Sequence, residues 1–96
     1  MGLSGRGLCF PKNNIVLFKM QDKNIILTIV GNNIRKFRKE KGISQEEFAL
    51  DTNFDRSYIG RIERGERNIS VLTLYKLAKS LNIEPASLFY DDENKL

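Results

Sequence analysis

Apolar residues recur at steps of three and four positions between Asn24 and Lys41, which is the spacing of one face of an α-helix. The apolar stripe consists of Ile26, Ile29 or Val30, Ile34 and Phe37. Basic residues occupy the other faces, and Gly42 follows at a position where helices commonly end in a left-handed conformation. The pattern predicts a first helix over residues 24–41.

A capping box marks the start of a second helix. Ser44 and Glu47 have the spacing at which the hydroxyl accepts from the amide of Glu47 and the carboxylate reaches back to the amide of Ser44. This helix must be short, because Asn53 suits a left-handed turn and Asp55 suits the next N-cap. We therefore predict a tight corner between two short helices.

The third predicted helix covers residues 56–64 and is apolar on one side only. Ile59 and Ile62 lie three positions apart on that side, and polar residues cover the rest. Gly65 closes the helix. Such a helix packs on the domain along one side and exposes the others.

Two further helices complete the prediction. Ser70 caps the fourth, and its apolar face is predicted to be core: Val71, Leu74, Leu77, Ala78 and Leu81. Asn82 ends this helix in a left-handed conformation, and Pro85 fits the first turn of a fifth. The fifth helix buries Ala86, Leu88 and Phe89. Five short helices over residues 25–90 make a compact all-α domain.

The two ends of the chain lack these patterns. Residues 1–24 hold three of the seven glycines and show no helical period, so we interpret them as an N-terminal arm. The arm is either poorly ordered or forms a short strand over Ile15–Met20, and Met20 is an alternative start of translation. Residues 91–96 begin with three acidic residues and are predicted to be a solvated tail.

Composition limits the class of protein. A chain of 96 residues fits one domain, and 41% hydrophobic with 29% charged residues is typical of a soluble globular protein. The net charge of +4 and the pI near 9.4 favour an anionic partner. The run Ile15–Phe18 is too short for a secretory signal and no run reaches the length of a membrane span, so we expect no membrane association and a cytoplasmic location.

The residue types argue against an enzyme. The chain has no histidine and a single cysteine, Cys9, so it lacks the usual zinc ligands and the commonest general base. It also lacks a glycine-rich phosphate loop and a nucleophile with a partner base. We expect no catalysis, no metal and no cofactor.

The unit from Ser44 to Gly65 suits binding of double-stranded DNA. A short helix, a turn of about four residues and a second short helix can present the second helix to the major groove, which is about 12 Å wide. Arg56 and Arg61 can offer planar forks to guanine, and Ser57 can bond to several bases. Tyr58 either contacts a thymine methyl or a phosphate, or is half-buried against the second helix. The predicted phosphate contacts are Gln45, Arg64, Arg67 and Asn68.

Two structural roles follow from residues beside the apolar positions. Arg38 and Glu63 adjoin such positions, so they are either surface charges or a partly buried ion pair that joins the first helix to the third. The C-terminal apolar residues exceed what a small domain covers, and we predict that they continue into a homodimer interface: Leu88, Phe89 and Tyr90.

Three segments carry a family resemblance: Ile43–Ala49, Ile59–Gly65 and Leu77–Ile83. Through them, the chain from about Ile34 to Phe89 resembles the helix-turn-helix proteins of the phage Cro and lambda-type repressor family. The resemblance implies five helices and a symmetric dimer on a palindromic operator. It also implies that Gln45 contacts phosphate and that Arg38 pairs with Glu63 inside the domain.

Within that family, Asp55–Gly60 and Ile62–Asn68 look most like the controller proteins of restriction-modification systems, which regulate endonuclease expression. The chain departs from the family at Asn53, where glycine is common, and in residues 1–24, which have no counterpart in short controllers.

The resulting hypothesis is a bacterial or phage transcription regulator, repressor or activator, that needs no small-molecule effector. The alternative is an antitoxin whose residues 1–24 fold onto a toxin and which represses its own gene.

Overall fold

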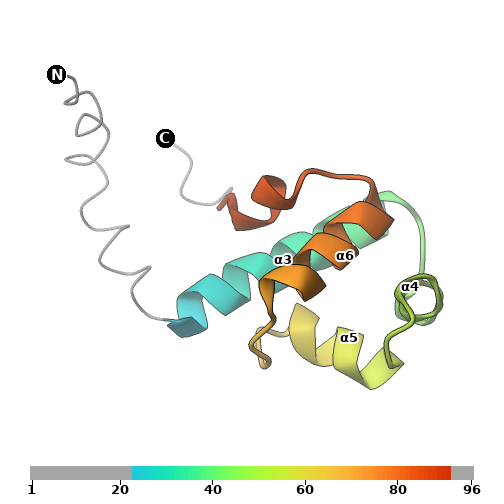
Figure 1. The fold of residues 1–96 in the computed structure, drawn as a ribbon, viewed down its shortest axis with the longest axis horizontal. Helices are drawn as coiled ribbons and strands as arrows, with labels where there is room; N and C mark the ends of the chain where they lie inside the picture. Colours follow the sequence, from blue (N-terminus) through green and yellow to red (C-terminus); the bar gives the residue numbers. More distant parts are fainter. Residues whose placement is uncertain (1–22, 92–96) are drawn as a thin grey trace, which may run out of the picture.

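The computed structural model describes residues 23–91, which contain four α-helices, one 3-10 helix and no strand (Figure 1). The elements are α3 (Lys23–Glu40), α4 (Gln45–Thr52), α5 (Arg56–Glu63), α6 (Val71–Leu81) and η2 (Pro85–Phe89). The predicted all-α fold is confirmed, although the fifth helix is a 3-10 helix. Three predicted features lie outside the described residues: the short strand over Ile15–Met20, the arm that would fold onto a toxin in the antitoxin alternative, and the tail beyond residue 91.

The helix ends follow from local sequence. Ser44 Oγ accepts from the amide of Glu47 at 3.0 Å, and a carboxylate oxygen of Glu47 accepts from the amide of Ser44 at 2.7 Å. Asn53 and Asn82 have φ of 65° and 59°, so both helices end in the predicted left-handed conformation. Short-range hydrogen bonds therefore set the lengths of α4 and α6.

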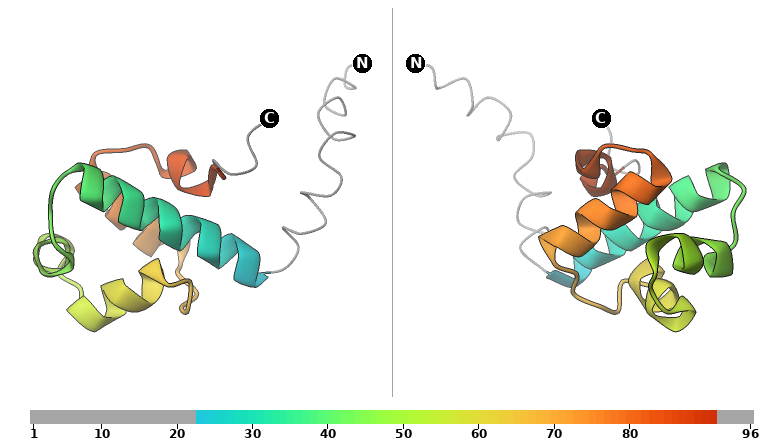
Figure 2. Two further views of the ribbon diagram at one scale, coloured as in Figure 1. Left: turned by 180° about the vertical axis from the view of Figure 1, so that it is seen from behind. Right: turned by 45° about the vertical axis from the view of Figure 1, so that its right-hand side comes forward.

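The longest helix, α3, runs through the middle of the domain, with η2 on one side and α5 on the other (Figures 1 and 2). Helix α6 packs beside α3, and α4 contacts both α5 and α6. The core between them includes five side chains that are fully buried: Ile34, Phe48, Ile59, Leu77 and Leu88. This arrangement leaves the outer side of α5 exposed to solvent.

Predictions about four apolar residues are wrong. The fifth helix was predicted to bury Ala86 and Phe89, but Ala86 is exposed and Phe89 is 46% exposed. Val71 was expected in the core but is 79% exposed, because it is the first residue of α6 and lies about one turn before the buried stretch starts at Leu74. Leu88 was expected in a dimer interface but is completely buried within its own chain, since η2 packs against α3 and α6. Leu88 therefore contributes to the core and offers no surface to a partner.

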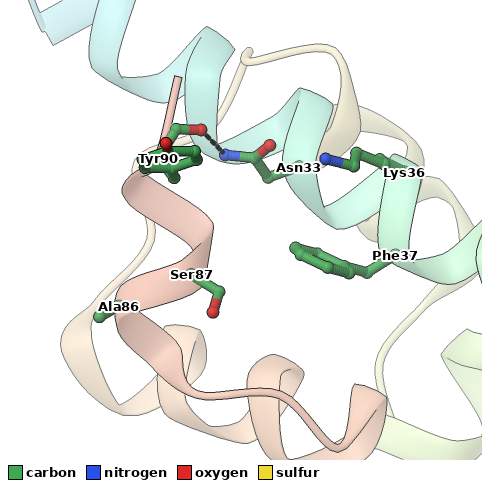
Figure 3. A pocket seen from close by; sticks show the side chains of 6 residues that line it. All are labelled: Asn33, Lys36, Phe37, Ala86, Ser87 and Tyr90. Carbon is green, nitrogen blue, oxygen red and sulfur yellow. Dashed lines mark hydrogen bonds between the residues drawn. The ribbon is translucent and has the colours of Figure 1, made fainter. Parts of the chain in front are cut away.

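A buried asparagine holds η2 on α3. The side-chain amide of Asn33 donates to the carbonyl oxygens of Leu88 and Tyr90 at the end of η2, each at 2.8 Å. Figure 3 shows the bond to Tyr90. These carbonyls have no partner within the short helix, so the amide satisfies them. A cavity of about 310 Å³ lies beside this contact and is lined by Asn33, Lys36, Phe37, Ala86, Ser87 and Tyr90.

Helices α3 and α5 approach each other closely at Gly31, a contact that the sequence pattern did not indicate. A Cβ atom there would collide with the carbonyl oxygen of Ile62 and lie 2.8 Å from that of Glu63. Both oxygens belong to backbone that cannot rotate away. Gly31 thus sets how tightly α5 packs against α3.

We expect Gly31→Ala to destabilise the domain by about 2 kcal/mol. Overpacking costs about 1–3 kcal/mol, and the higher helix propensity of alanine offsets at most about 1 kcal/mol. Urea unfolding followed by circular dichroism measures the change. The control is Asn32→Ala at the exposed neighbouring position, which should stay within about 0.5 kcal/mol; equal stabilities of the two variants would refute the close approach.

Candidate nucleic-acid interface

Helix α5 presents two different sides. Ile59 and Ile62 are 0% and 2% exposed and face the core, whereas the opposite side is exposed to solvent. We call this opposite side the outer face of α5 and define it by Arg56, Ser57, Arg61 and Arg64. Helix α5 lies along an edge of the domain with nothing in the described residues covering this face (Figures 1 and 2).

The predicted base readers divide into two groups. Arg56, Ser57 and Arg61 are all exposed on the outer face. Tyr58 is half-buried, with its ring 5.1 Å from that of Phe54 in an edge-to-face arrangement. The structure therefore places Tyr58 against the turn between α4 and α5, which is the packing alternative considered above.

The N-terminus of α5 uses its cap residue differently from the prediction. Asp55 occupies the N-cap position, but its side chain makes no capping hydrogen bond. Instead, its carboxylate accepts from the Ser57 hydroxyl at 3.3 Å. Ser57 is thereby oriented at the start of the outer face.

The predicted phosphate contacts lie around both ends of this unit. Arg67 stacks its guanidinium over the ring of Tyr58 at 5.3 Å, and Asn68 is exposed in the same loop. Gln45 and Arg64 both approach Gly60, since a Cβ there would lie 3.3 Å from Arg64 Nη1 and 3.8 Å from Gln45 Oε1. The fold thus brings the first residue of α4 and the residue that ends α5 to the same part of α5.

Gln45 is held by a contact that the sequence did not reveal. Its Nε2 donates to Glu63 Oε1 at 3.0 Å, so the amide nitrogen is engaged inside the domain. The amide nitrogen carries two N–H donors and this bond uses one of them, so the second N–H and the backbone amides of the first turn remain as donors for a phosphate. The Gln45 contact with phosphate stays a prediction.

Arg38 and Glu63 form a bidentate, buried ion pair. Arg38 Nε and Nη2 donate to the two carboxylate oxygens at 2.6 and 3.1 Å, and the side chains are 8% and 2% exposed. Arg38 Nη1 also donates to the carbonyl oxygen of Ile43 at 2.9 Å. The pair joins the C-terminal part of α3 to the end of α5 and to the loop before α4.

The loop after α5 folds back over that helix. Gly65 has a φ of 75°. Its amide donates to the carbonyl oxygen of Ile62 at 3.0 Å, and the amide of Glu66 donates to the carbonyl oxygen of Arg61 at 2.9 Å. These two bonds form a Schellman motif. A Cβ on Gly65 would also lie 3.0 Å from Thr28 of α3, so both its conformation and its packing require glycine.

Glu66, to which the sequence pattern assigned no role, lies beside the outer face and contacts Arg64. Its carboxylate accepts from Arg64 Nε at 3.0 Å and from Arg64 Nη2 at 3.3 Å. The hydrogen bond from Arg64 lowers the pKa of Glu66, and the charges of Arg64 and Arg61 act in the same direction. Glu66 is therefore an acidic neighbour of two predicted DNA contacts.

Comparison with known proteins assigns the family. The sequence profile described as "Helix-turn-helix" matches residues 34–88, which is more than half of the chain. The chain belongs to the helix-turn-helix family. Within the described residues of this helix-turn-helix protein, no helix is long and apolar enough to cross a membrane.

The homologues of this helix-turn-helix protein include controller proteins of restriction-modification systems. Control protein C.MunI of Mycoplasma is 44% identical over 66 residues, which are 68% of this chain and 89% of that protein. The crystal structure of controller protein C.AhdI from Aeromonas hydrophila has a TM-score of 0.63 at 48% identity, covering 66% of this chain and 96% of that one.

A third relative has been solved with DNA. Controller protein C.Esp1396I, described as a tetramer in complex with its natural 35 base-pair operator, is 39% identical with a TM-score of 0.61. The match covers 67% of this chain and 84% of that one. The predicted resemblance to controller proteins is therefore confirmed.

We expect Arg38→Met to destabilise the helix-turn-helix domain by about 3–5 kcal/mol at neutral pH. The substitution leaves the Glu63 carboxylate buried without its cation, and a broken buried pair costs about this much. Urea unfolding gives the change in free energy.

The double variant Arg38→Met/Glu63→Met is the control, because it removes both charges. It should recover part of the loss, since a buried pair replaced by apolar residues is often close to neutral. A double variant less stable than Arg38→Met would contradict the assigned pairing.

Proposed function

We propose that this chain is a sequence-specific, DNA-binding transcription regulator that acts as the controller protein of a restriction-modification system. The observation that carries the proposal is the outer face of α5, where Arg56, Ser57 and Arg61 are exposed while the inner side is fixed in the core. Its homologues are controller proteins, and C.Esp1396I was solved with its operator.

In this proposal α5 enters the major groove and reads base edges. An arginine guanidinium can donate two hydrogen bonds to guanine O6 and N7, and a serine hydroxyl can hydrogen-bond to several bases. The start of α4 and the loop from Arg64 to Asn68 lie beside α5 and contact phosphates, which fixes the register of α5 on the duplex. The net charge of +4 supports the approach to DNA.

We further propose that the regulator is active in the cytoplasm, has no catalytic activity and needs no cofactor or effector. The family to which it belongs consists of transcription regulators, and groove recognition by a helix requires only side-chain and backbone contacts. A palindromic operator with half-sites about one helical turn apart would match two copies of α5.

A homodimer would present two copies of α5 to the operator, and two exposed apolar surfaces are candidates for its interface. Val71 and Leu72 are each 79% exposed and Tyr75 is 53% exposed, which is unusual for apolar side chains on one short helix. The C-terminal residues Phe89 and Tyr90, 46% and 57% exposed, form the second candidate surface. We propose the α6 surface, because its start follows directly from the loop at the end of α5 and so couples dimerisation to the spacing of the two reading helices.

We expect Arg56→Ala to weaken binding to the operator by about 1–3 kcal/mol and to relax base preference at one position, because it removes a base contact. Arg67→Ala should weaken binding to all duplexes by a similar factor, because it removes a phosphate contact. The measurement is fluorescence anisotropy on an operator obtained by in vitro selection and on a scrambled duplex.

The control is Lys79→Ala, which removes an exposed positive charge from α6. It should change both affinities little. Unchanged operator affinity of Arg56→Ala would show that this arginine does not read bases.

We expect Leu72→Glu to weaken self-association roughly ten- to hundredfold, because it replaces a buried leucine at the interface by a charge and the burial of leucine is worth about 1.5–3 kcal/mol. Sedimentation equilibrium measures the effect. The matched control is Leu50→Glu, since Leu50 is 80% exposed on α4. If Phe89→Glu dissociates the dimer and Leu72→Glu does not, the interface lies on the C-terminal surface instead.

A further inference from the structure

Glu66 lies at the edge of the outer face of α5, beside a guanidinium that the proposed function assigns to phosphate. We propose that Glu66 occupies Arg64 in the DNA-free protein, so that a DNA phosphate must displace an internal carboxylate. This competition lowers affinity for DNA of any sequence. The inference rests on the proposed function and adds a residue that lowers the affinity of the protein for DNA.

The carboxylate takes an edge of Arg64 that is able to bind a phosphate. Arg64 Nε and Nη2 donate to the two oxygens of Glu66 at 3.0 and 3.3 Å, which is the bidentate geometry that guanidinium groups form with carboxylates and phosphates alike. The remaining nitrogen, Nη1, lies over Gly60. Arg64 therefore cannot offer its Nε–Nη2 edge to DNA while Glu66 holds it.

The backbone keeps the competitor in place. The amide of Glu66 donates to the carbonyl oxygen of Arg61 in the Schellman motif, and Gly65 is packed against Thr28 of α3. These contacts fix the backbone of residue 66 two positions from Arg64, whatever rotamers the side chains adopt. The fold therefore keeps the Glu66 carboxylate within reach of the Arg64 guanidinium.

The pair is weak enough to be displaced. The side chains of Arg64 and Glu66 are 59% and 52% exposed, and exposed ion pairs of this kind change an equilibrium constant by no more than about fivefold. The other proposed contacts on α4 and α5 would bring a DNA phosphate beside Arg64, and this phosphate can then replace Glu66. Because phosphate contacts carry no sequence information, the competition lowers binding to operator and non-operator DNA by the same factor.

The test compares Glu66→Gln with Glu84→Gln on a mixed-sequence duplex about two helical turns long, titrated by fluorescence anisotropy at several KCl concentrations. Glu84 is the matched control, because it is exposed and precedes η2, on the opposite side of α3 from α5 (Figure 1). We expect Glu66→Gln to bind about two- to fivefold more tightly. Its plot of log affinity against log salt should be steeper, by at most about 0.9, because salt screens the exposed Arg64–Glu66 pair and so weakens the competition in the parent protein. Glu84→Gln should change both values less.

The same two measurements in an Arg64→Ala background separate competition from direct repulsion. We expect Glu66→Gln to have no more effect there than Glu84→Gln, because the competed group is gone. An undiminished gain in that background would mean that Glu66 repels DNA directly and would overturn the proposal. Equal effects of Glu66→Gln and Glu84→Gln on the parent protein would overturn it too.

Failure of the proposed function gives a different result. If the unmodified chain binds neither the mixed-sequence duplex nor a selected operator, the DNA-binding assignment falls, and this inference with it. If the unmodified chain binds DNA with a steep salt dependence, but Glu66→Gln changes the affinity no more than Glu84→Gln, the proposed function stands and only the competition is refuted. Thermal unfolding of each variant by circular dichroism verifies that the exposed substitutions leave the fold intact.

Discussion

The buried ion pair between Arg38 and Glu63 is the interaction on which the DNA-binding arrangement depends. It joins α3 to the end of α5, and through Gln45 and the Ile43 carbonyl it also fixes the start of α4. Charges taken out of water are tolerated only when their hydrogen-bonding groups are satisfied, and the bidentate geometry with these extra bonds meets that condition. The same network therefore determines where α5, the proposed reading helix, lies and how α4 begins.

Two glycines add a steric constraint to this electrostatic one. Gly31 lets the backbone of α3 touch the last residues of α5, and Gly65 lets the following loop touch Thr28. Both contacts press the C-terminal end of α5 onto α3, close to the ion pair. A helix that reads bases must be held with little freedom, and α5 is fixed by backbone contact where side chains would leave room for movement.

The outer face of α5, unlike its buried side, carries weak contacts between exposed side chains. Several side chains proposed to contact DNA already hold a partner in the free protein: Ser57 with Asp55, Arg64 with Glu66 and Arg67 with Tyr58. The two hydrogen-bonded pairs are exposed, and such contacts are weak. They orient the polar groups and remain easy for nucleic acid to replace, whereas the strong contacts lie beneath the helix.

Local sequence determined the helices, the capping box at Ser44, the left-handed ends at Asn53 and Asn82, and the exposed polar residues of α5, because these depend on neighbours within about four positions. Tertiary packing decided the rest. The Arg38–Glu63 contact spans 25 positions and the Asn33–Leu88 contact spans 55, so no local pattern specifies them, and the pairing was suggested only by family resemblance and adjoining apolar residues. Packing likewise buried Leu88 and exposed Val71, because each outcome depends on which surfaces of other helices come within contact distance.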